Sequence, residues 1–269
     1  MNPVRRLGAA VGGMRWGQVI LELALLIAGI LIALAVDGWM DDRRDMRTER
    51  NYLELLVRDL DRDLDMLAEY TAFEERQVED GIRAYRALRA GAPPEEREAV
   101  AASLSNLMSR RTLRITRPTY TDLISTGNLR LIRNARLRDS VTDLYERNER
   151  LLAIRDRNNL VFVDQQFLQF IMDNGLIAPR TSSNMPSSAK SNLKFARRIE
   201  VPVGVDNDRL WELGPASPEW ITLTNKVWHR AQVTQAALDQ TEVMANEIRG
   251  LRQAIADELA RRWPDDRRG

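Results

Sequence analysis

The clearest pattern along the chain is an almost uninterrupted apolar run near its start. Residues 19–36 read VILELALLIAGILIALAV and contain one charged side chain, Glu22. A run of this length is about the shortest that crosses the hydrocarbon core of a bilayer as a helix. Trp16 and Trp39 flank it at a helical separation of about 34 Å, which suits two interfacial aromatic anchors. The pattern therefore predicts a transmembrane helix over residues 16–39, preceded by a short basic tail over residues 1–15.

A cleaved secretory signal is the alternative explanation of the same run. Arg5 and Arg6 would supply its basic region, and Ala33-Leu34-Ala35 has the form of a cleavage site. However, the run is longer than the usual apolar region of a signal, and helix-favouring residues follow it without a break. We therefore expect a retained membrane anchor.

One face of the predicted span combines an ionisable residue with small residues. Glu22 lies about one turn into the apolar run, where a carboxyl group is costly and marks a candidate functional position. Gly29 and Ala33 lie on the same face, and small residues at this spacing permit close contact between helices in lipid. The face predicts packing against another protein. Alternatively, Glu22 reaches the headgroup level near Trp16 and stays hydrated.

Beyond Trp39 the apolar positions take the spacing of a long amphipathic helix. Residues 43–90 contain no Pro, and their apolar side chains recur three or four positions apart. The pattern predicts a helix that continues directly from the span and ends at residues 91–94, Gly-Ala-Pro-Pro. A shorter helix is expected over residues 95–110. The predicted stripe consists of Leu53, Leu56, Leu60, Leu64, Leu67, Tyr70, Val78, Ile82, Tyr85 and Leu88.

The middle of the chain carries turn and capping signals. Thr119 and Asp122 have the form of a capping box, and Gly127 would end the short helix that they begin. Asn134 is a suitable N-cap for a helix that runs without Pro or Gly from residue 135 to about residue 172. These signals predict a short helix, an elbow and a second long helix.

The last third of the chain begins with a segment rich in Pro and Ser. Residues 175–216 predict a long loop with a short extended piece at residues 199–205. Ser217 as N-cap and Pro218 at the first helical position predict a last long helix over residues 217–263, and Pro264 ends it. A polar tail follows over residues 264–269.

The elements combine into one predicted architecture. Residues 40–174 would form the first part of a helical bundle, and the C-terminal helix would pack on it, because helices of this length need to share their apolar stripes. The predicted fold class is all-α: one N-terminal transmembrane helix continuing into an elongated antiparallel helical bundle of three long helices plus short ones.

Composition narrows the possible chemistry. The chain of 269 residues carries 40 Lys and Arg against 39 Asp and Glu, and this net charge of +1 gives no general reason to expect nucleic-acid binding. The absence of Cys excludes disulfides, zinc thiolate sites, iron–sulfur clusters and cysteine nucleophiles, and the single His excludes sites built on several histidines. No Walker or G-x-S-x-G motif occurs. We therefore expect no catalytic residues, no cofactor and no metal, and predict that the protein is not an enzyme.

An alternation of acidic residues superficially suggests a calcium loop. Asp59, Asp61, Asp63 and Asp65 alternate with Leu and Arg, but the stretch lies within a predicted helix and lacks the Gly and Glu that such a loop requires. Opposite charges at helical spacing favour a solvated face instead.

The densest basic cluster comes between two predicted helices. It could contact lipid headgroups, a nucleic acid or an acidic partner, although cations at a helix end also complement the helix dipole. This possible contact patch consists of Arg110, Arg111, Arg114 and Arg117.

Two stretches resemble an uncharacterised family of bacterial single-span membrane proteins, known as a domain of unknown function. The run ILELALLIAGILIALAVDGW, with the charged Tyr-Leu helix after it, is similar to that family's E-aliphatic-GILIAL-x-V-D-x-W segment. Residues 119–138 resemble its Tyr-x-x-Leu-x-x-x-Gly-Asn-Leu segment. The resemblance implies a membrane-anchored helical protein of a bacterial cell and supplies no activity, cofactor or site residue.

Basic residues flank the predicted span on both sides, so their count alone gives no strong bias in orientation. Acidic residues dilute the group after the span. We expect the N-terminus in the cytoplasm and the bulk of the chain in the periplasm, at the inner membrane. The flanking basic residues are Arg5, Arg6 and Arg15 before the span and Arg43, Arg44, Arg47 and Arg50 after it.

These features predict a membrane-anchored, non-catalytic helical protein. The leading hypothesis is an accessory, scaffold or assembly subunit of a membrane protein complex. Its partners would be the lipid bilayer and either other membrane subunits or a second copy of the chain. The alternative is an extracytoplasmic helical sensor or binding module that works through a separate partner and has a pocket between its helices.

Overall fold

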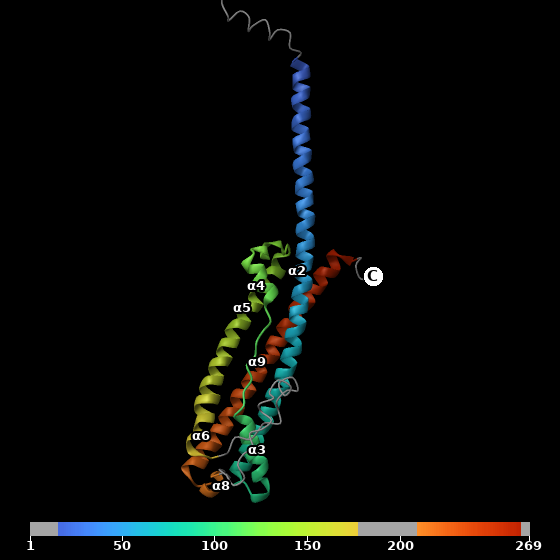
Figure 1. Ribbon diagram of the computed structural model, residues 1–269. Coiled ribbons are helices and arrows are strands. Elements are labelled where there is room, and N and C mark those ends of the chain that lie inside the picture. Colours follow the sequence, from blue (N-terminus) through green and yellow to red (C-terminus); the bar gives the residue numbers. More distant parts are fainter. Residues whose placement is uncertain (1–15, 177–208, 265–269) are drawn as a thin grey trace, which may run out of the picture.

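The computed structural model describes residues 16–176 and 209–264. Within these ranges the chain is helical and contains no strand, which confirms the predicted all-α class (Figure 1). η1 and η2 are 3-10 helices, and η3 is a π-helix. The elements are α2 (Trp16–Arg89), η1 (Pro94–Glu96), α3 (Arg97–Leu107), α4 (Pro118–Ser125), η2 (Asn128–Leu131), α5 (Ala135–Asn158), η3 (Asn159–Leu168), α6 (Gln169–Asn174), α8 (Leu210–Leu213) and α9 (Pro218–Arg262).

α2 is a single helix of 74 residues that contains both the apolar run and the amphipathic segment after it. No Pro interrupts it, and at the usual helical rise it is about 110 Å long. It ends before Gly91, which takes a left-handed φ of +85° ahead of Pro93 and Pro94. Figure 1 shows its first half standing clear of the bundle and its second half running through the bundle. The predicted continuity of the apolar run with the first bundle helix is confirmed.

Three long helical stretches form the bundle: the second half of α2, the stretch α5–η3–α6, and α9 (Figure 1). We call the end nearest the apolar run the proximal end and the other the distal end. α9 runs antiparallel to the other two and contacts α2 most extensively. α3 packs on α2 at the distal end, and an extended segment over residues 109–117 then returns the chain to the proximal end. Because of this return, α5 runs in the same direction as α2.

The bundle buries two separate apolar cores. The proximal core joins α2, α4, α5 and α9 and includes the predicted stripe residues Leu53, Leu56 and Leu60, all fully buried. The distal core joins the end of α2, α3, η3, α6 and the start of α9 around residues such as Leu104 and Phe167. The apolar spacing therefore identified the buried face of α2 correctly in the proximal half.

Most predicted helix ends have the expected geometry. Gly127 follows α4 with a left-handed φ of +71°, as predicted for an elbow between two helices. Asn134 caps α5 by accepting the backbone N–H of Leu137 (3.3 Å), and Ser217 caps α9 by accepting that of Trp220 (3.2 Å). The short polar side chains at these positions satisfy N–H groups that a helix start leaves without partners.

Two predicted helices differ in detail from the structure. The long helix expected from residue 135 to about residue 172 changes type, because a π-helical stretch, η3, lies between α5 and α6. A π-helix has a wider turn with i→i+5 hydrogen bonds, which apolar spacing does not reveal. The helix expected over residues 95–110 ends earlier, at Leu107.

The capping box predicted at Thr119 and Asp122 does not form. Asp59 of α2 instead accepts the backbone N–H of Thr119 (3.2 Å), and Asp122 accepts a hydrogen bond from the Tyr52 hydroxyl (2.6 Å). The start of α4 packs against α2, so its acceptor comes from another helix rather than from its own first turn.

The predicted solvated face over residues 59–65 is only half correct. Asp65 is exposed and Asp61 pairs with Arg252 at the surface, whereas Asp59 and Asp63 are buried. The two buried carboxylates have lost water, and backbone N–H groups take its place.

Three buried carboxylates of α2 accept hydrogen bonds from backbone N–H groups of another part of the chain. Besides Asp59, Asp63 accepts the backbone N–H of Thr116 (2.7 Å), and Glu49 accepts that of Arg133 (2.8 Å). All three donors belong to the segment between α3 and α5, much of which has no helical partner for its N–H groups. Buried backbone N–H groups require acceptors, and α2 supplies them.

The described ends of the predicted loop lie together. Leu176 and Leu210 are fully buried, and the backbone N–H of Leu210 donates to the carbonyl of Leu176 (3.2 Å). α8 then packs on α9. The extended piece predicted at residues 199–205 lies outside the described residues, as do residues 1–15 and most of the polar tail.

Asp63 makes the stability of the fold depend on pH. Burial raises its pKa from 3.8 to about 6, even though Thr116 donates to one carboxylate oxygen, and the other oxygen has no partner. Between about pH 4 and pH 6, the folded chain therefore keeps a proton on Asp63 that the unfolded chain releases. The free energy of unfolding falls as pH rises through this range. We expect the free energy of unfolding of the wild type to fall by up to about 3 kcal/mol across this window relative to Asp63→Asn. Denaturant titrations at a series of pH values in mild detergent measure this difference.

Asp65→Asn is the matched control, because Asp65 is exposed on the same helix. Its pH profile should follow that of the wild type. Parallel profiles for the wild type and Asp63→Asn would contradict the prediction, since Asp63 would then titrate with the same pKa in the folded and unfolded chain.

Candidate functional site

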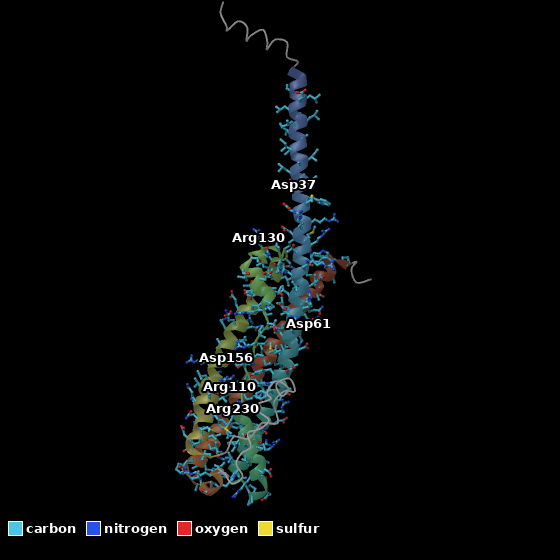
Figure 2. All side chains as sticks on the ribbon, in the orientation of Figure 1. Asp37, Asp61, Arg110, Arg130, Asp156 and Arg230 are labelled. Atoms are coloured by element: carbon cyan, nitrogen blue, oxygen red, sulfur yellow. The ribbon has the colours of Figure 1, made fainter. Side chains whose placement is uncertain are left out.

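The apolar part of α2 presents a helix surface that no other described part of the chain covers. Within the described residues α2 is the one helix long and apolar enough to cross a membrane, and none of its apolar window is buried. Figure 2 shows the side chains of this part extending sideways from the helix, above the bundle and with no other described element beside them. Glu22, Gly29 and Ala33 are exposed, and nothing lies within 4 Å of a Cβ added at Gly29. The face predicted for helix packing is therefore free of contacts with the described chain.

The two predicted interfacial anchors are described to different extents. Trp39 is exposed, and the guanidinium of Arg43 lies 5.0 Å from its ring centre. A ring and a cation in this arrangement attract each other and suit the polar edge of a bilayer. Trp16 is the first residue of α2, but its side chain lies outside the described residues.

A cluster of ion pairs fastens the proximal end of the bundle to α2 just beyond the apolar run. Glu49 is 1% exposed; it accepts the backbone N–H of Arg133 (2.8 Å) and pairs with Arg262 of α9 (2.5 Å). The side chain of Arg133 also pairs with Asp42, which lies about 9 Å along the helix from Val36. The bundle is thus held a short, fixed distance from the apolar run.

The four arginines of the possible contact patch all lie on the extended segment, but three of them contact the chain itself. Arg110 pairs with η3, Arg111 donates to α2, and Arg117 pairs with α5. Arg114 is exposed and has no hydrogen bond or ion pair with the described residues. The cluster therefore fastens the segment to three helices, and contact with an outside partner stays a prediction. The three partners are Asp164 (2.7 Å), the backbone carbonyl of Glu69 (3.2 Å) and Glu149 (2.9 Å).

A cavity of about 210 Å³ lies between the extended segment and α5, and we call it the α5 cavity. Arg114 and Arg117 line it from the segment, and Tyr145, Asn148 and Asp156 line it from α5. Asn148 is 1% exposed, and neither atom of its amide group has a hydrogen-bond partner. The buried hydroxyl of Tyr145 also has none. The sequence analysis identified Arg114 and Arg117 as candidate contact residues, but it did not identify the α5 residues that line the cavity opposite them.

A buried layer of polar residues separates the two apolar cores. Arg230 of α9 is 3% exposed (Figure 2), and its guanidinium donates to the carbonyls of Leu107 and Ser109 at the end of α3 (both 3.2 Å). It also donates to Gln77 of α2 (3.4 Å) and to Thr234. A cation suits the carbonyl end of a helix, where the helix dipole is negative.

Residues of α2 and α5 complete the layer. The guanidinium of Arg155 lies 4.7 Å from the ring centre of Tyr70 and donates to the hydroxyl of Thr241 (2.8 Å). Burial raises the pKa of Glu74, and the nearby Tyr70 hydroxyl, Arg230 and Arg155 offset part of this rise. Burial lowers the pKa of Arg230. The polar layer consists of Tyr70, Glu74, Gln77, Arg155, Arg230, Thr234 and Thr241.

The apolar spacing of α2 did not reveal this layer. The predicted stripe passes from Tyr70 to Val78, whereas the buried face passes through Glu74 and Gln77, and Val78 is only half-buried. The available signal was the gap in the stripe itself, because charged and amide residues occupy the positions where the next apolar contacts belong.

The residues of the polar layer form hydrogen bonds and charge interactions mainly with one another. The polar layer sets two guanidinium groups beside one carboxyl group and directs most of their described donors at carbonyls, hydroxyls and an amide. Among the described residues no group of three or more His, Cys, Asp or Glu is placed to hold a metal ion. Comparison with known protein families, curated proteins and solved structures finds no match to this chain. The family resemblance noted above therefore stays a prediction.

Arg230 should be essential to the stability of the polar layer. Arg230→Met leaves Glu74 with one fewer cation and removes the donors to the carbonyls at the end of α3, so we expect a loss of about 3 kcal/mol in the free energy of unfolding. The exposed Arg157 of α5 is the control, and Arg157→Met should change it by less than about 0.5 kcal/mol. Denaturant titration of the full-length protein in mild detergent measures both. Equal stabilities for the two variants would show that the polar layer contributes nothing.

Proposed function

We propose that this chain is a membrane-anchored, non-catalytic helical protein that acts as an accessory, scaffold or assembly subunit of a membrane protein complex. Its setting would be the inner membrane of a bacterium, with the N-terminus in the cytoplasm and the bundle in the periplasm. The observation that carries the proposal is the continuity of α2, which joins an uncovered apolar helix to a packed bundle without a hinge.

The uncovered apolar helix supports the proposal that the chain associates with a partner in the membrane. An ionisable side chain facing hydrocarbon is costly, and membrane helices lower that cost by turning such a residue toward another protein or toward water. Glu22 lies on the face that also carries Gly29 and Ala33, where small residues let a second helix approach closely. The partners we propose are the lipid bilayer and, through this face, other membrane subunits or a second copy of the chain.

The bundle supports a positioning role. Ion pairs of Glu49 and Arg133 hold its proximal end close to the apolar run, and the three long helical stretches extend it away from that end (Figure 1). Such a bundle presents its distal end at a fixed distance from the membrane surface. A scaffold or assembly subunit could use this property to hold a partner away from the membrane.

A second candidate function has a specific observation in its favour. An extracytoplasmic sensor or binding module needs a pocket, and the α5 cavity contains buried polar groups without partners. A sensor of this form would pass its signal through a separate partner.

Replacing Glu22 should weaken association in the membrane. We expect Glu22→Leu, and separately Gly29→Leu, to reduce the amount of partner subunit or second copy that co-purifies with the tagged, full-length protein in mild detergent. The reason is that both changes alter the proposed packing face. Mass spectrometry of the native complex measures the stoichiometry.

Leu31 lies on the opposite face of the helix, half a turn away in projection from Glu22, so Leu31→Phe is the control and should leave association unchanged. If Glu22→Leu and Gly29→Leu retain the wild-type stoichiometry, the span does not associate through this face.

The orientation has its own test. A reporter enzyme that is active only outside the cytoplasm, fused after Gly269, should be active in intact cells. A fusion of the same reporter before residue 1 serves as the control and should be inactive. The reverse result would place the bundle in the cytoplasm.

A further inference from the structure

Two residues that line the α5 cavity carry buried polar atoms without hydrogen-bond partners. The amide nitrogen and oxygen of Asn148 and the hydroxyl of Tyr145 are all covered by protein, and none has a partner in the chain. Buried polar groups in folded proteins are almost always hydrogen-bonded, because leaving one unmet costs about 1–3 kcal/mol. The Tyr145 hydroxyl interacts electrostatically with Asp63 and Asp59 of α2, so the two amide atoms of Asn148 are the ones that point to a molecule that the chain alone does not supply.

The charged residues around the cavity indicate which charges that molecule should carry. Arg117 is already paired with Glu149 (2.9 Å), so these two side chains neutralise each other. Arg114 remains as a cation without an ion pair in the described chain, and Asp156 has no ion pair there either, although its negative charge helps to raise the pKa of Arg110. The cavity therefore offers one available positive and one available negative group, with a donor and an acceptor from Asn148.

We propose that the α5 cavity binds a small zwitterion, namely a free α-amino acid. Its carboxylate would pair with Arg114 and accept a hydrogen bond from the amide nitrogen of Asn148. Its ammonium group would donate to the amide oxygen of Asn148, while Asp156, about 12 Å further along α5, would contribute a more distant negative charge. An Asn amide can serve both ends of the same ligand because it carries two donors and an acceptor.

The size and shape of the cavity agree with such a ligand. A volume of about 210 Å³ is below that of a pocket for a drug-sized molecule but well above that of a single water. The cavity is open to solvent on one side, so the side chain of the amino acid can extend outward, and the site selects for the zwitterionic backbone rather than for one side chain.

The cavity is open, but the Asn148 amide atoms are covered, so a ligand reaches them only if the rim moves. The side chains of Arg117 and Glu149 are 52% and 66% exposed, and an ion pair this exposed contributes little to stability. Separation of this pair would uncover Asn148 at small cost.

This inference goes beyond the proposed scaffold function and gives the second candidate, the sensor, its ligand class. The two proposals fail independently, because the packing face of the span is tested by co-purification and the cavity is tested by ligand binding.

The experiment is a thermal melt and a calorimetric titration of the full-length protein in mild detergent with L-alanine. We expect L-alanine to raise the melting temperature, because a ligand that binds the folded state alone stabilises it. Acetate and ethylamine, which each carry one of the two charges, should cause no comparable shift. Arg114→Gln should weaken the affinity for L-alanine at least about tenfold, whereas Arg136→Gln, at an exposed position on the same helix as Asn148, should leave it unchanged.

Asn148→Leu separates a folding defect from a binding defect. It removes the unmet polar atoms at similar volume, so the ligand-free variant should melt at a higher temperature than the wild type and no longer respond to L-alanine. Three results would overturn the proposal: no shift with L-alanine, an equal shift with acetate, or a full response in Asn148→Leu. A destabilised Asn148→Leu combined with no response of the wild type would assign the cavity to ordered water.

Discussion

Buried and partly buried backbone N–H groups between α3 and α5 need acceptors, and carboxylates on α2 provide them. Glu49, Asp59 and Asp63 lie along one face of that helix and accept the N–H groups of Arg133, Thr119 and Thr116. These bonds hold the extended segment, the start of α4 and the turn before α5 against α2, because these N–H groups have no regular ladder of their own. The return of the chain to the proximal end, the start of α4 and the direction of α5 all depend on them. The same requirement explains why a pattern of alternating Asp residues, which reads as a surface helix, is partly buried.

Features that depend on neighbouring residues in the sequence could be predicted, and features that depend on distant ones could not. The apolar run, the long amphipathic helix, the left-handed Gly127 and the caps at Asn134 and Ser217 follow from local spacing and local chemistry. The cap of α4 was assigned to the wrong residue because its acceptor, Asp59, lies on another helix. The polar layer could not be predicted for the same reason, because the acceptors of Arg230 include groups at the end of α3 and on α2. The α5 cavity could be only half anticipated: Arg114 and Arg117 are conspicuous in the sequence, but Asn148 looks like any polar residue of a helix until the extended segment covers it.

The polar layer gives the bundle something that its two apolar cores cannot provide. Long helices with Leu-rich stripes can slide past one another by a turn with little loss of contact, because one Leu replaces another. A guanidinium group that must meet the two carbonyls at the end of α3 has one acceptable register. The layer therefore costs some stability relative to an apolar core and selects a single alignment of α2, α3 and α9. In a protein without disulfides or metal ligands among its described residues, such internal polar contacts are the available means of fixing alignment.

The unbroken path of α2 also makes the chain a lever. About 80 Å of helix separates the end of the apolar run from the distal end of α2. Membrane helices tilt by about 20° on average, and the tilt changes with the thickness of the bilayer. For a straight rod of this length, a tilt of that size displaces the far end sideways by about 27 Å. A difference of a few ångströms in lipid thickness would thereby become a large lateral displacement at the turn after Arg89, amplified by leverage alone.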